Sequence, residues 1–363
     1  MGLTVTRLTL SDFRNYEYKR LGLSGNLTIL VGPNATGKTS MIEALQLLTS
    51  GRSFRKPATI DLVRRGAAEA RVTLEASQGS RRAETELRVT ADGVRSYLLN
   101  GKSVRGRREI AGTLPSVVFT PDDISVVKGP SDGRRATVDT LGEQLSRTYG
   151  ALRREYERAL RHRNALLKEG RSSASLEVWS ETLADLGASL SHHRARLLER
   201  VESVARGVYE TVSSGEELSV RYEMPWLPPG QGNSDKKAVK EALLGELRRR
   251  AEEEVRRGMT LSGPHRDDIV FQVDGSEARA FASQGQQRSI VLAWKIAEVS
   301  VIEEVTGETP LLLLDDVMSE LDGSRREALA ALVGGHTQTV VTTANLQYFS
   351  SELLESAEVV MLP

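Results

Sequence analysis

The 363-residue sequence predicts an α/β protein with a helical insertion, and three observations support this fold class. Short alternating or apolar runs fill the first 120 residues and return after Gly258, whereas Arg, Glu, Leu and Ala with helical spacing lie between them. A phosphate-loop motif joins an apolar run to a helix near the N-terminus. A second apolar run, "PLLLLDD", ends in two aspartates. Strands that alternate with helices favour a parallel or mixed sheet.

The predicted domains are discontinuous along the chain. Residues 1–124 and 258–363 are expected to form an α/β head, and residues 125–257 an inserted helical lobe. Four glycines interrupt the heptad spacing of this lobe, at Gly150, Gly170, Gly187 and Gly207. We therefore expect a short bundle of helices and no long coiled coil.

The composition limits the cellular compartments and the kinds of partner that fit this protein. Forty-nine basic and 49 acidic residues cancel, so no global electrostatic field indicates a nucleic-acid partner, although a local basic face is compatible with one. Cysteine is absent, which excludes disulfides and thiolate zinc sites and fits a reducing compartment. No run approaches the roughly 20 apolar residues that span a bilayer. We expect a cytoplasmic protein without a membrane partner.

The stretch "GPNATGKT" fits the phosphate-loop pattern in its proper setting, after the apolar run "LTILV" and before a helix. Gly32 and Gly37 permit a tight turn whose N–H groups surround phosphates, Lys38 adds a positive charge, and Thr39 is a ligand for Mg²⁺. The nucleotide-binding candidates are Gly32, Pro33, Asn34, Ala35, Thr36, Gly37, Lys38, Thr39 and Ser40. The alternative is a glycine-rich turn without a ligand.

The run "LLLLDD" supplies the acidic partner that a phosphate loop requires. Four apolar residues predict a buried parallel strand, whose end delivers Asp315 and Asp316 to the phosphate crevice. We assign Asp315 to the magnesium and Asp316 to the orientation or deprotonation of the attacking water. The alternative is a pair of aspartates that caps the next helix.

The segment "ASQGQQRS" opens a predicted helix with an apolar stripe. A serine hydroxyl and a close-approach glycine, without an acidic side chain, are typical of an anion site at a helix N-terminus. Its candidate residues are Ser283, Gln284, Gly285 and Gln286. An ordinary serine N-cap is the alternative.

These segments carry a family resemblance. "ASQGQ" followed about thirty residues later by the acidic strand resembles the signature motif and Walker B strand of ABC-type ATPase heads. Within that class the chain resembles the RecF family of bacterial recombination and gap-repair proteins, relatives of SMC heads. The matching blocks, in RecF order, are "LTLSDFRNY", "VGPNATGKTSMIEAL", "GRSFR", "LSGPHRDD", "FASQGQQRS" and "LLLLDDVMSELD".

The resemblance implies a P-loop ABC-type head that binds ATP and Mg²⁺ and forms an ATP-dependent homodimer. It implies binding to DNA at the single-strand/double-strand junctions of gaps, association with the nucleoid, and cooperation with RecO and RecR in loading RecA. By motif match, Ser283 acts in trans on the nucleotide of the partner subunit, and Ser319 to Asp322 cross the dimer interface. The implied role is DNA repair, recombination and replication restart within the SOS response.

Three departures from the ABC pattern affect the expected chemistry. Asp316 replaces the usual glutamate and is one methylene shorter, so we expect weak, slow ATP hydrolysis that works as a binding switch. "TPDD" replaces the Q-loop glutamine, and Asp122 or Asp123 is a candidate substitute. The switch histidine is missing; Thr342, Thr343 and Asn345 lie near its place.

Weaker candidates remain open. His265 and Arg266 either sense nucleotide or DNA, or belong to a surface loop with an ion pair to Asp267 or Asp268. Arg14 and Arg55 are candidates for nucleotide, phosphate or DNA contacts, with a solvated side chain as the alternative. Three basic clusters are candidate DNA-backbone contacts or solvated faces, at residues 105–108, 133–135 and 152–163.

Two other functions compete with an ATP-driven DNA clamp. One is a nucleotide-dependent scaffold without significant hydrolysis, which the short Asp316 side chain keeps open. The other is the ATPase subunit of a transporter, which would need the missing glutamine and histidine.

Overall fold

The computed structural model describes residues 3–363 apart from 24, 111–112, 171–172, 214 and 228–234. The chain forms two compact units, residues 1–123 with 292–363 and residues 124–291. Residues 258–291, which the predicted head includes, fall in the second unit. The predicted domain boundaries themselves stay a prediction.

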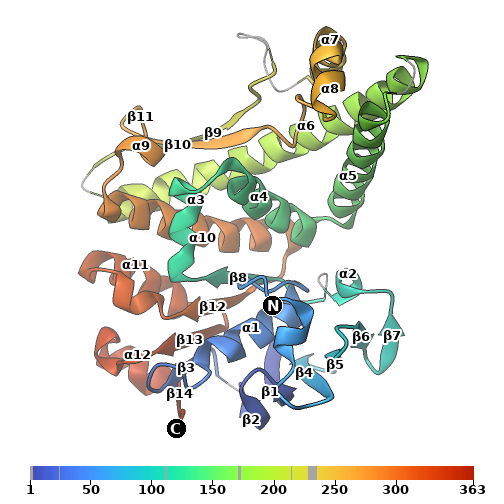
Figure 1. Cartoon of the computed structure of the whole chain (residues 1–363). Helices are drawn as coiled ribbons and strands as arrows, with labels where there is room; N and C mark the ends of the chain where they lie inside the picture. The colour runs from blue at the N-terminus through green and yellow to red at the C-terminus, as the bar shows by residue number, and fades with distance from the viewer. Residues whose placement is uncertain (1–2, 24, 111–112, 171–172, 214, 228–234) are drawn as a thin grey trace. The chain divides into compact units, whose positions relative to one another are not determined.

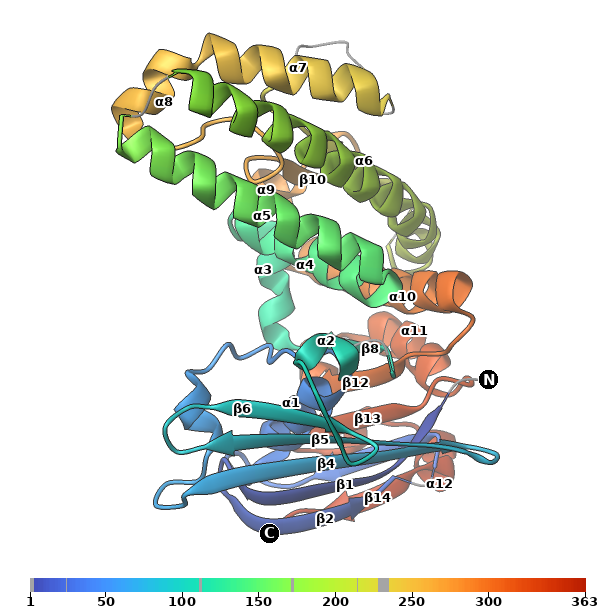
Figure 2. The ribbon, with the colours of Figure 1, turned by 90° about the vertical axis from the view of Figure 1, so that its right-hand side faces the viewer.

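The first unit contains a six-stranded antiparallel sheet, and Figure 2 shows its strands running side by side. On β4, Ala70, Val72, Leu74 and Ala76 alternate with more exposed residues and are buried, as the period of a strand requires. In spatial order its strands are β2 (Tyr16–Gly22), β1 (Thr4–Phe13), β4 (Glu69–Gln78), β5 (Arg81–Thr90), β6 (Arg95–Leu99) and β7 (Lys102–Val104).

A five-stranded parallel sheet forms the other layer of this unit. Strands β3 and β12 are buried along their whole length, as near-continuous apolar runs in a covered parallel sheet should be. The spatial order is β14 (Glu358–Met361), β3 (Leu27–Val31), β13 (Thr339–Thr343), β12 (Leu311–Asp315) and β8 (Ser116–Phe119). The predicted α/β class is confirmed, with antiparallel and parallel strands in separate sheets.

Helix α1 (Lys38–Thr49) packs against strands of both sheets. Met41, Ile42 and Leu45 are fully buried and join the core that the two sheets share. The sequence pattern predicted this helix correctly, because apolar residues three and four positions apart line one face. Burial of that face holds the N-terminus of α1 at the end of β3.

Shorter helices complete the first unit. They are η1 (Thr59–Leu62), α2 (Arg107–Ile110), η2 (Pro121–Ile124) at the boundary, η3 (Val317–Glu320), α11 (Gly323–Val333), η4 (Leu346–Tyr348) and α12 (Ser351–Ser356). Helix α10 (Gln284–Thr306) begins in the second unit and ends in the first. Among the described residues, no helix combines the length and apolarity that a membrane crossing requires.

The second unit is mainly helical, and α6 packs against both α5 and α7 (Figure 1). Its helices are α3 (Ser125–Lys128), α4 (Ser131–Leu145), α5 (Arg147–Lys168), α6 (Ser173–Val212), α7 (Lys236–Arg249), α8 (Ala251–Arg257) and α9 (Ala278–Phe281).

The predicted glycine breaks are only partly correct. Gly170, at φ +61°, lies between α5 and α6, but Gly150 lies within α5, and Gly187 and Gly207 lie within α6. At Gly187 a Cβ atom would come within 2.9 Å of Leu243 Cδ2, so this glycine permits close packing instead of ending the helix.

A three-stranded antiparallel sheet also belongs to the second unit. It contains β11 (Ser276–Glu277), β10 (Asp268–Val273) and β9 (Leu218–Glu223) in spatial order. Residues 218–223 lie within the predicted helical lobe, so β9 is not expected from the sequence. Strand β10 lies within the predicted head, whereas in the structure it pairs with β9 and β11.

Two aspartates of the "GPHRDD" segment stabilise this unit through hydrogen bonds to distant residues. Asp267 is fully buried and accepts hydrogen bonds from Ser191, Tyr222 and Trp226. Asp268 accepts two hydrogen bonds from the Arg134 guanidinium, at 2.7 and 2.8 Å. Arg134 is only 3% exposed, so its place in the predicted DNA-binding cluster at residues 133–135 is wrong.

His265 is also part of this interior. Its Nδ1 lies 2.7 Å from the Tyr156 hydroxyl and its Nε2 lies 3.1 Å from the Thr260 carbonyl oxygen, so Nε2–H donates and Nδ1 accepts. Burial lowers the pKa of His265 to about 4, which keeps the ring neutral. Arg266 is exposed, with its guanidinium 3.7 Å from Met259 Sδ. The side chains of Asp267 and Asp268 bond to residues outside this loop. The alternative of an ion pair between the loop and one of these aspartates is therefore wrong.

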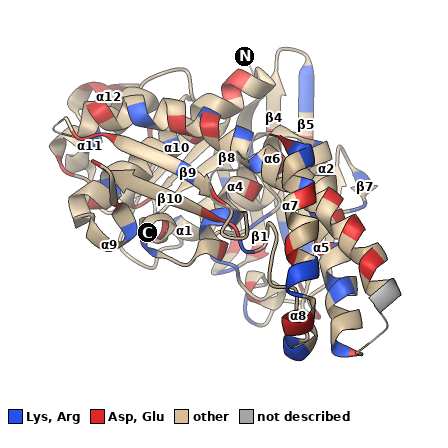
Figure 3. Cartoon of the chain, turned by 90° about the horizontal axis from the view of Figure 1, so that it is seen from above, with Lys and Arg blue, Asp and Glu red and all other residues tan. Residues whose placement is uncertain are grey.

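Helix α5 carries both signs of charge, as Figure 3 shows. Arg153 pairs with Asp139, Glu143 and Glu157, and Arg163 is buried against Glu254 at 2.6 Å. These two arginines of the cluster at 152–163 therefore stabilise the helical unit. In the cluster at 105–108, the side chains of residues 107 and 108 lie outside the described part.

The buried His265 predicts a pH-dependent stability. Its pKa of about 4 lies below the unfolded value, so its contribution is complete above pH 6.5 and is lost as the pH falls toward 4. The unfolding free energy of the parent protein should fall between pH 7.5 and pH 5. About 2 kcal/mol of this fall should be absent in His265→Gln. Urea titrations at several pH values measure this slope.

The exposed Ser351, at the start of α12, is the control position, because Ser351→Gln changes no titratable group. Ser351→Gln should keep the slope of the parent protein. Equal slopes for the parent and His265→Gln would show that His265 is not held neutral in the folded chain.

Candidate functional site

The phosphate loop lies between a buried strand and a buried helix. Strand β3 ends at Val31, α1 begins at Lys38, and Gly37 between them has φ +99°. A Cβ atom at Gly37 would come within 2.6 Å of Asn15 Nδ2 and of the Tyr16 hydroxyl. Both the left-handed backbone and the close approach therefore require glycine at this position. The loop geometry agrees with the sequence motif.

Lys38 points its charge back onto this loop. The side chain is buried, and Nζ donates to the carbonyl oxygens of Gly32 at 2.6 Å and Pro33 at 2.7 Å. The ammonium is thus held where the loop turns, next to the N-terminus of α1. A phosphate here would give Lys38 a charged acceptor, and the helix N-terminus would add to the attraction.

Asp315 ends strand β12 and meets two hydroxyl groups. Its Oδ1 accepts from Thr39 Oγ1 at 3.0 Å and from Thr342 Oγ1 at 2.8 Å. Burial raises the pKa of Asp315, and the two hydrogen bonds oppose this increase. Thr39 and Asp315, the two residues that the sequence assigns to magnesium, therefore lie within hydrogen-bond distance of each other.

The same oxygen atoms fit a magnesium ion. Mg²⁺ prefers oxygen ligands and binds through one or two carboxylates together with substrate phosphates. Asp315 and Thr39 supply a carboxylate and a hydroxyl beside the phosphate loop. In the described part of the chain, no group of three or more His, Asp or Glu side chains forms a separate metal cluster.

Asp316 adopts a left-handed backbone, with φ +54°. Its N–H donates to Thr342 Oγ1 at 3.0 Å, and its half-buried side chain lines the phosphate pocket. Burial raises the pKa of Asp316, and the positive charge of Lys38 opposes the increase. The predicted role of Asp316 in orienting the attacking water stays a prediction.

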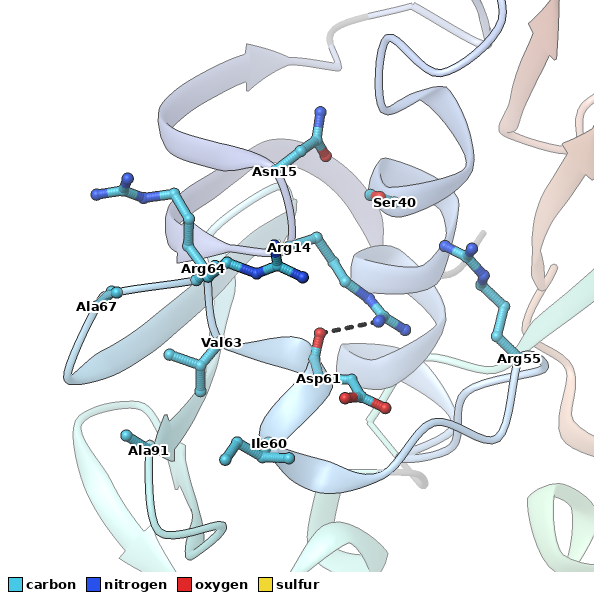
Figure 4. A pocket seen from close by; sticks show the side chains of 12 residues that line it. Arg14, Asn15, Ser40, Arg55, Ile60, Asp61, Val63, Arg64, Ala67 and Ala91 are labelled. Atoms are coloured by element: carbon cyan, nitrogen blue, oxygen red, sulfur yellow. Dashed lines mark hydrogen bonds between the residues drawn. The ribbon is translucent and has the colours of Figure 1, made fainter.

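Two adjoining cavities surround these residues. The phosphate pocket, about 440 Å³, is lined by Asn15, Asn34, Ala35, Gly37, Lys38, Thr39, Ser40, Arg55, Asp315, Asp316 and Thr342. A larger hollow of about 750 Å³ is lined by Arg14, Asn15, Ser40, Arg55, Ile60, Asp61, Val63, Arg64, Arg65, Gly66, Ala67 and Ala91 (Figure 4). Asn15, Ser40 and Arg55 line both cavities, so the two spaces adjoin each other.

Arg14 lines the larger hollow and Arg55 lines both cavities, whereas their contacts with nucleotide, phosphate or DNA stay a prediction. Arg14 lines the larger hollow and donates to the Asp61 carbonyl oxygen at 2.8 Å, the dashed line in Figure 4. It also forms a two-pronged ion pair with Glu43 on α1. Arg55 is 45% exposed. Neither arginine is a freely solvated side chain.

The signature segment of the second unit forms a reciprocal helix cap. Gln286 N–H donates to Ser283 Oγ at 3.2 Å, and Ser283 N–H donates to Gln286 Oε1 at 2.7 Å. Ser283 and Gln284 are exposed, and Gly285 is partly exposed. The N-cap interpretation is therefore correct for this conformation. The exposed hydroxyl and helix N-terminus remain compatible with an additional anion.

The segment after Asp316 is organised by its own side chains. Ser319 Oγ donates to the Asp316 carbonyl oxygen at 2.9 Å. Asp322 caps α11 by accepting from Arg325 N–H at 3.1 Å, and this hydrogen bond lowers the pKa of Asp322. Both side chains are exposed, so a role at a subunit interface stays a prediction.

The candidate γ-phosphate sensors are only partly supported. Asp123 accepts from Thr120 and pairs with Lys295 at 3.2 Å, and neither Asp122 nor Asp123 lines the phosphate pocket. Thr343 and Asn345 bond to each other. Thr342 does line the pocket and contacts Asp315.

Three residues that contribute to the site are not among those predicted from the sequence. Asn15 and Tyr16 donate to the Thr36 carbonyl oxygen and so support the phosphate loop from the turn between β1 and β2. Burial raises the pKa of Tyr16 to about 12, which keeps its hydroxyl a donor. Glu43 is fully buried beside Arg14. The signal for Glu43 in the sequence was a single acidic residue among the apolar residues of helix α1.

Comparisons with known proteins agree with this geometry. The model of the RecF/RecN/SMC N terminal domain matches residues 4–361. The chain is 38% identical over 361 residues to the DNA replication and repair protein RecF of Synechococcus sp. (strain JA-3-3Ab), covering 98% of this chain and 95% of that protein. It is 39% identical over 359 residues to RecF of Gloeobacter violaceus, with coverages of 97% and 95%.

Solved structures give the same result. The recombination mediator protein RecF-ATP in the RecFOR pathway has a TM-score of 0.89 and 28% identity, with 96% of this chain and 94% of that chain covered. An SmcHead bound to the C-winged helix domain of ScpA has a TM-score of 0.56 at 17% identity, with coverages of 98% and 93%, and shows only a shared fold. From its near full-length match and its phosphate site, the chain belongs to the RecF family of DNA replication and repair proteins.

Proposed function

We propose that this protein is an ATP-dependent DNA clamp that hydrolyses ATP slowly. The observation that carries the proposal is the contact of Asp315 with Thr39 and Thr342, next to the Lys38 ammonium. Together they form an acidic and a basic half of one phosphate pocket, as an ATP–Mg²⁺ complex requires. A similar solved structure, the recombination mediator protein RecF-ATP, supports the same ligand.

The larger hollow suits the remainder of the nucleotide. It adjoins the phosphate pocket through Asn15, Ser40 and Arg55, and its wall includes apolar Ile60 and Val63. A purine and a ribose need an apolar surface with a few polar groups, and this hollow has both. We place the triphosphate in the pocket and the nucleoside in the hollow.

Residues of the chain divide the work of hydrolysis. Lys38 and the loop N–H groups hold the phosphates, and Asp316 orients the attacking water and accepts its proton. Mg²⁺, when bound at Thr39 and Asp315, neutralises charge on the phosphate oxygens. The short side chain of Asp316 is the reason for slow turnover, so ATP acts as a timed switch.

Two bound heads are proposed to close on each other. The exposed Ser283 and the N-terminus of α10 offer an anion site for the γ-phosphate held by the partner subunit. Ser319 and Asp322 lie at the proposed interface. Hydrolysis removes the shared γ-phosphate and opens the dimer.

The closed dimer is proposed to hold DNA at junctions of single-stranded and double-stranded DNA. Similarity to DNA replication and repair proteins, and to a solved recombination mediator protein of the RecFOR pathway, supports this role. RecO and RecR are the proposed partners, with RecA loading as the outcome in the cytoplasm at the nucleoid. A scaffold without hydrolysis is the alternative; the RecF relatives offer no support for a transporter subunit.

Replacing Asp316 tests hydrolysis. Asp316→Asn keeps the size of the side chain but removes the proton acceptor, so single-turnover phosphate release should fall about 100-fold or more while ATP still binds. Rapid-quench measurements with radiolabelled ATP follow the release.

Asp185→Asn changes an exposed carboxylate on α6 of the second unit and should release phosphate like the parent protein. No release from the parent protein would instead support the non-hydrolysing scaffold.

Replacing Ser283 tests the trans signature. Ser283→Arg places a bulky side chain at the α10 N-terminus, so ATP should still bind but should no longer double the mass of the protein. Light scattering with ATP, ADP or no nucleotide measures the mass.

The exposed Ser351, at the start of α12, gives the matched variant Ser351→Arg, which should dimerise like the parent protein. Unchanged dimerisation of Ser283→Arg would leave the signature segment with only its helix-capping role.

A further inference from the structure

Glu43 is a buried acid close to the nucleotide cavities, and it has no role in the proposed binding and hydrolysis of ATP. It lies on α1, five residues after Lys38, and its side chain has no exposed surface. A buried carboxylate is costly unless it is paired and hydrogen-bonded. The partners of Glu43 therefore show what this charge is retained for.

Three side chains satisfy the Glu43 carboxylate. Arg14 Nε and Nη2 donate to its two oxygens, each at 2.8 Å, which is the planar fork geometry that arginine forms with carboxylates. The Ser53 hydroxyl donates to Oε1. Arg55 Nη1 lies farther away, at 3.8 Å from Oε2. One buried negative charge thus faces two guanidinium groups.

The two arginines are held to different degrees. Arg14 is 16% exposed and also bonds to the Asp61 carbonyl oxygen, so its guanidinium is fixed from two sides. Arg55 is 45% exposed and is attracted to Glu43 only at long range. A weakly held, half-exposed guanidinium can turn toward a stronger anion at little cost.

Both guanidiniums face the place where a nucleotide would lie. Arg14 lines the larger hollow, and Arg55 lines both that hollow and the phosphate pocket (Figure 4). The charge of Arg55 also reaches the metal-side carboxylate, where it favours the ionised form of Asp315. Asp61, Asp315 and Asp316 are the acidic residues that line these cavities and oppose a bound anion near these arginines.

We propose that Glu43 is a positioning residue that sets Arg14 and Arg55 for a polyphosphate nucleotide bound in the two cavities. Glu43 fixes Arg14 on the wall of the hollow through the fork and keeps Arg55 near the junction of the two cavities. Arg55 then shares its charge between Glu43 and the phosphates. This inference rests on the proposed nucleotide site and adds to it the residue that orders its arginines.

The test compares ATP affinity in variants of the full chain. Glu43→Gln keeps the side-chain size but weakens its hold on both arginines, so the Kd for ATP should rise about tenfold or more. In a protein that already carries Arg14→Gln and Arg55→Gln, adding Glu43→Gln should cause no further rise. Isothermal titration calorimetry with Mg²⁺ measures these affinities, and thermal unfolding checks that each variant is folded.

A merely structural role gives a different pattern. In that case Glu43→Gln would weaken ATP binding equally with and without the two arginines, which would overturn the proposal. An unchanged Kd in folded Glu43→Gln would overturn it as well. If Glu43→Gln does not fold, Glu43→Asp keeps the charge but shortens its reach; a raised Kd supports the proposal and a parental Kd overturns it.

Two further variants complete the experiment. Glu75 accepts two hydrogen bonds from Arg7 Nη1 on the antiparallel sheet and lines neither cavity, so Glu75→Gln should bind ATP like the parent protein. Lys38→Ala tests the proposed site itself. Parental ATP affinity in Lys38→Ala would reject the phosphate site whatever Glu43 does, whereas lost affinity there with a parental Kd in Glu43→Gln rejects only the role of Glu43.

Discussion

The parallel alignment of β3, β13 and β12 is the constraint on which the site depends. Their carboxyl ends lie at one edge of a sheet, so residues far apart in sequence, Thr39, Asp315 and Thr342, come within hydrogen-bond distance. A carboxylate at the end of a buried strand is costly by itself. The two threonine hydroxyls stabilise it and hold it where a cation would bind.

The phosphate loop depends on the same alignment. Burial of β3 and α1 fixes the two ends of the loop, and Asn15 and Tyr16 support it from the antiparallel sheet. The loop is therefore shaped by packing before any ligand arrives, which lowers the ordering cost of binding. Lys38 adds the charge without having to leave the protein interior.

Charged residues have another purpose in the second unit. Asp267, Arg163 and Glu254 are buried and fully engaged with partners of the same unit, and His265 is kept neutral. Such satisfied polar groups specify how helices and strands pack, since any misplacement would leave a charge without a partner. In the first unit, by contrast, Lys38, Asp316 and Arg55 border a cavity. Whether a charged residue stabilises packing or lines a ligand cavity thus depends on its position more than on its residue type.

Local patterns were sufficient for the phosphate loop, α1 and the strand that carries Asp315 and Asp316, because glycine spacing and apolar runs act over a few neighbouring residues. The contacts of Thr342, Asn15 and Glu43 were decided by tertiary structure, since their partners are distant in sequence or their burial depends on packing of both sheets. Strand β9 was missed because its pairing partner, β10, begins 45 residues after β9 ends. Similarly, Gly187 looked like a break, and only the approach of Leu243 shows why a continuous helix needs it.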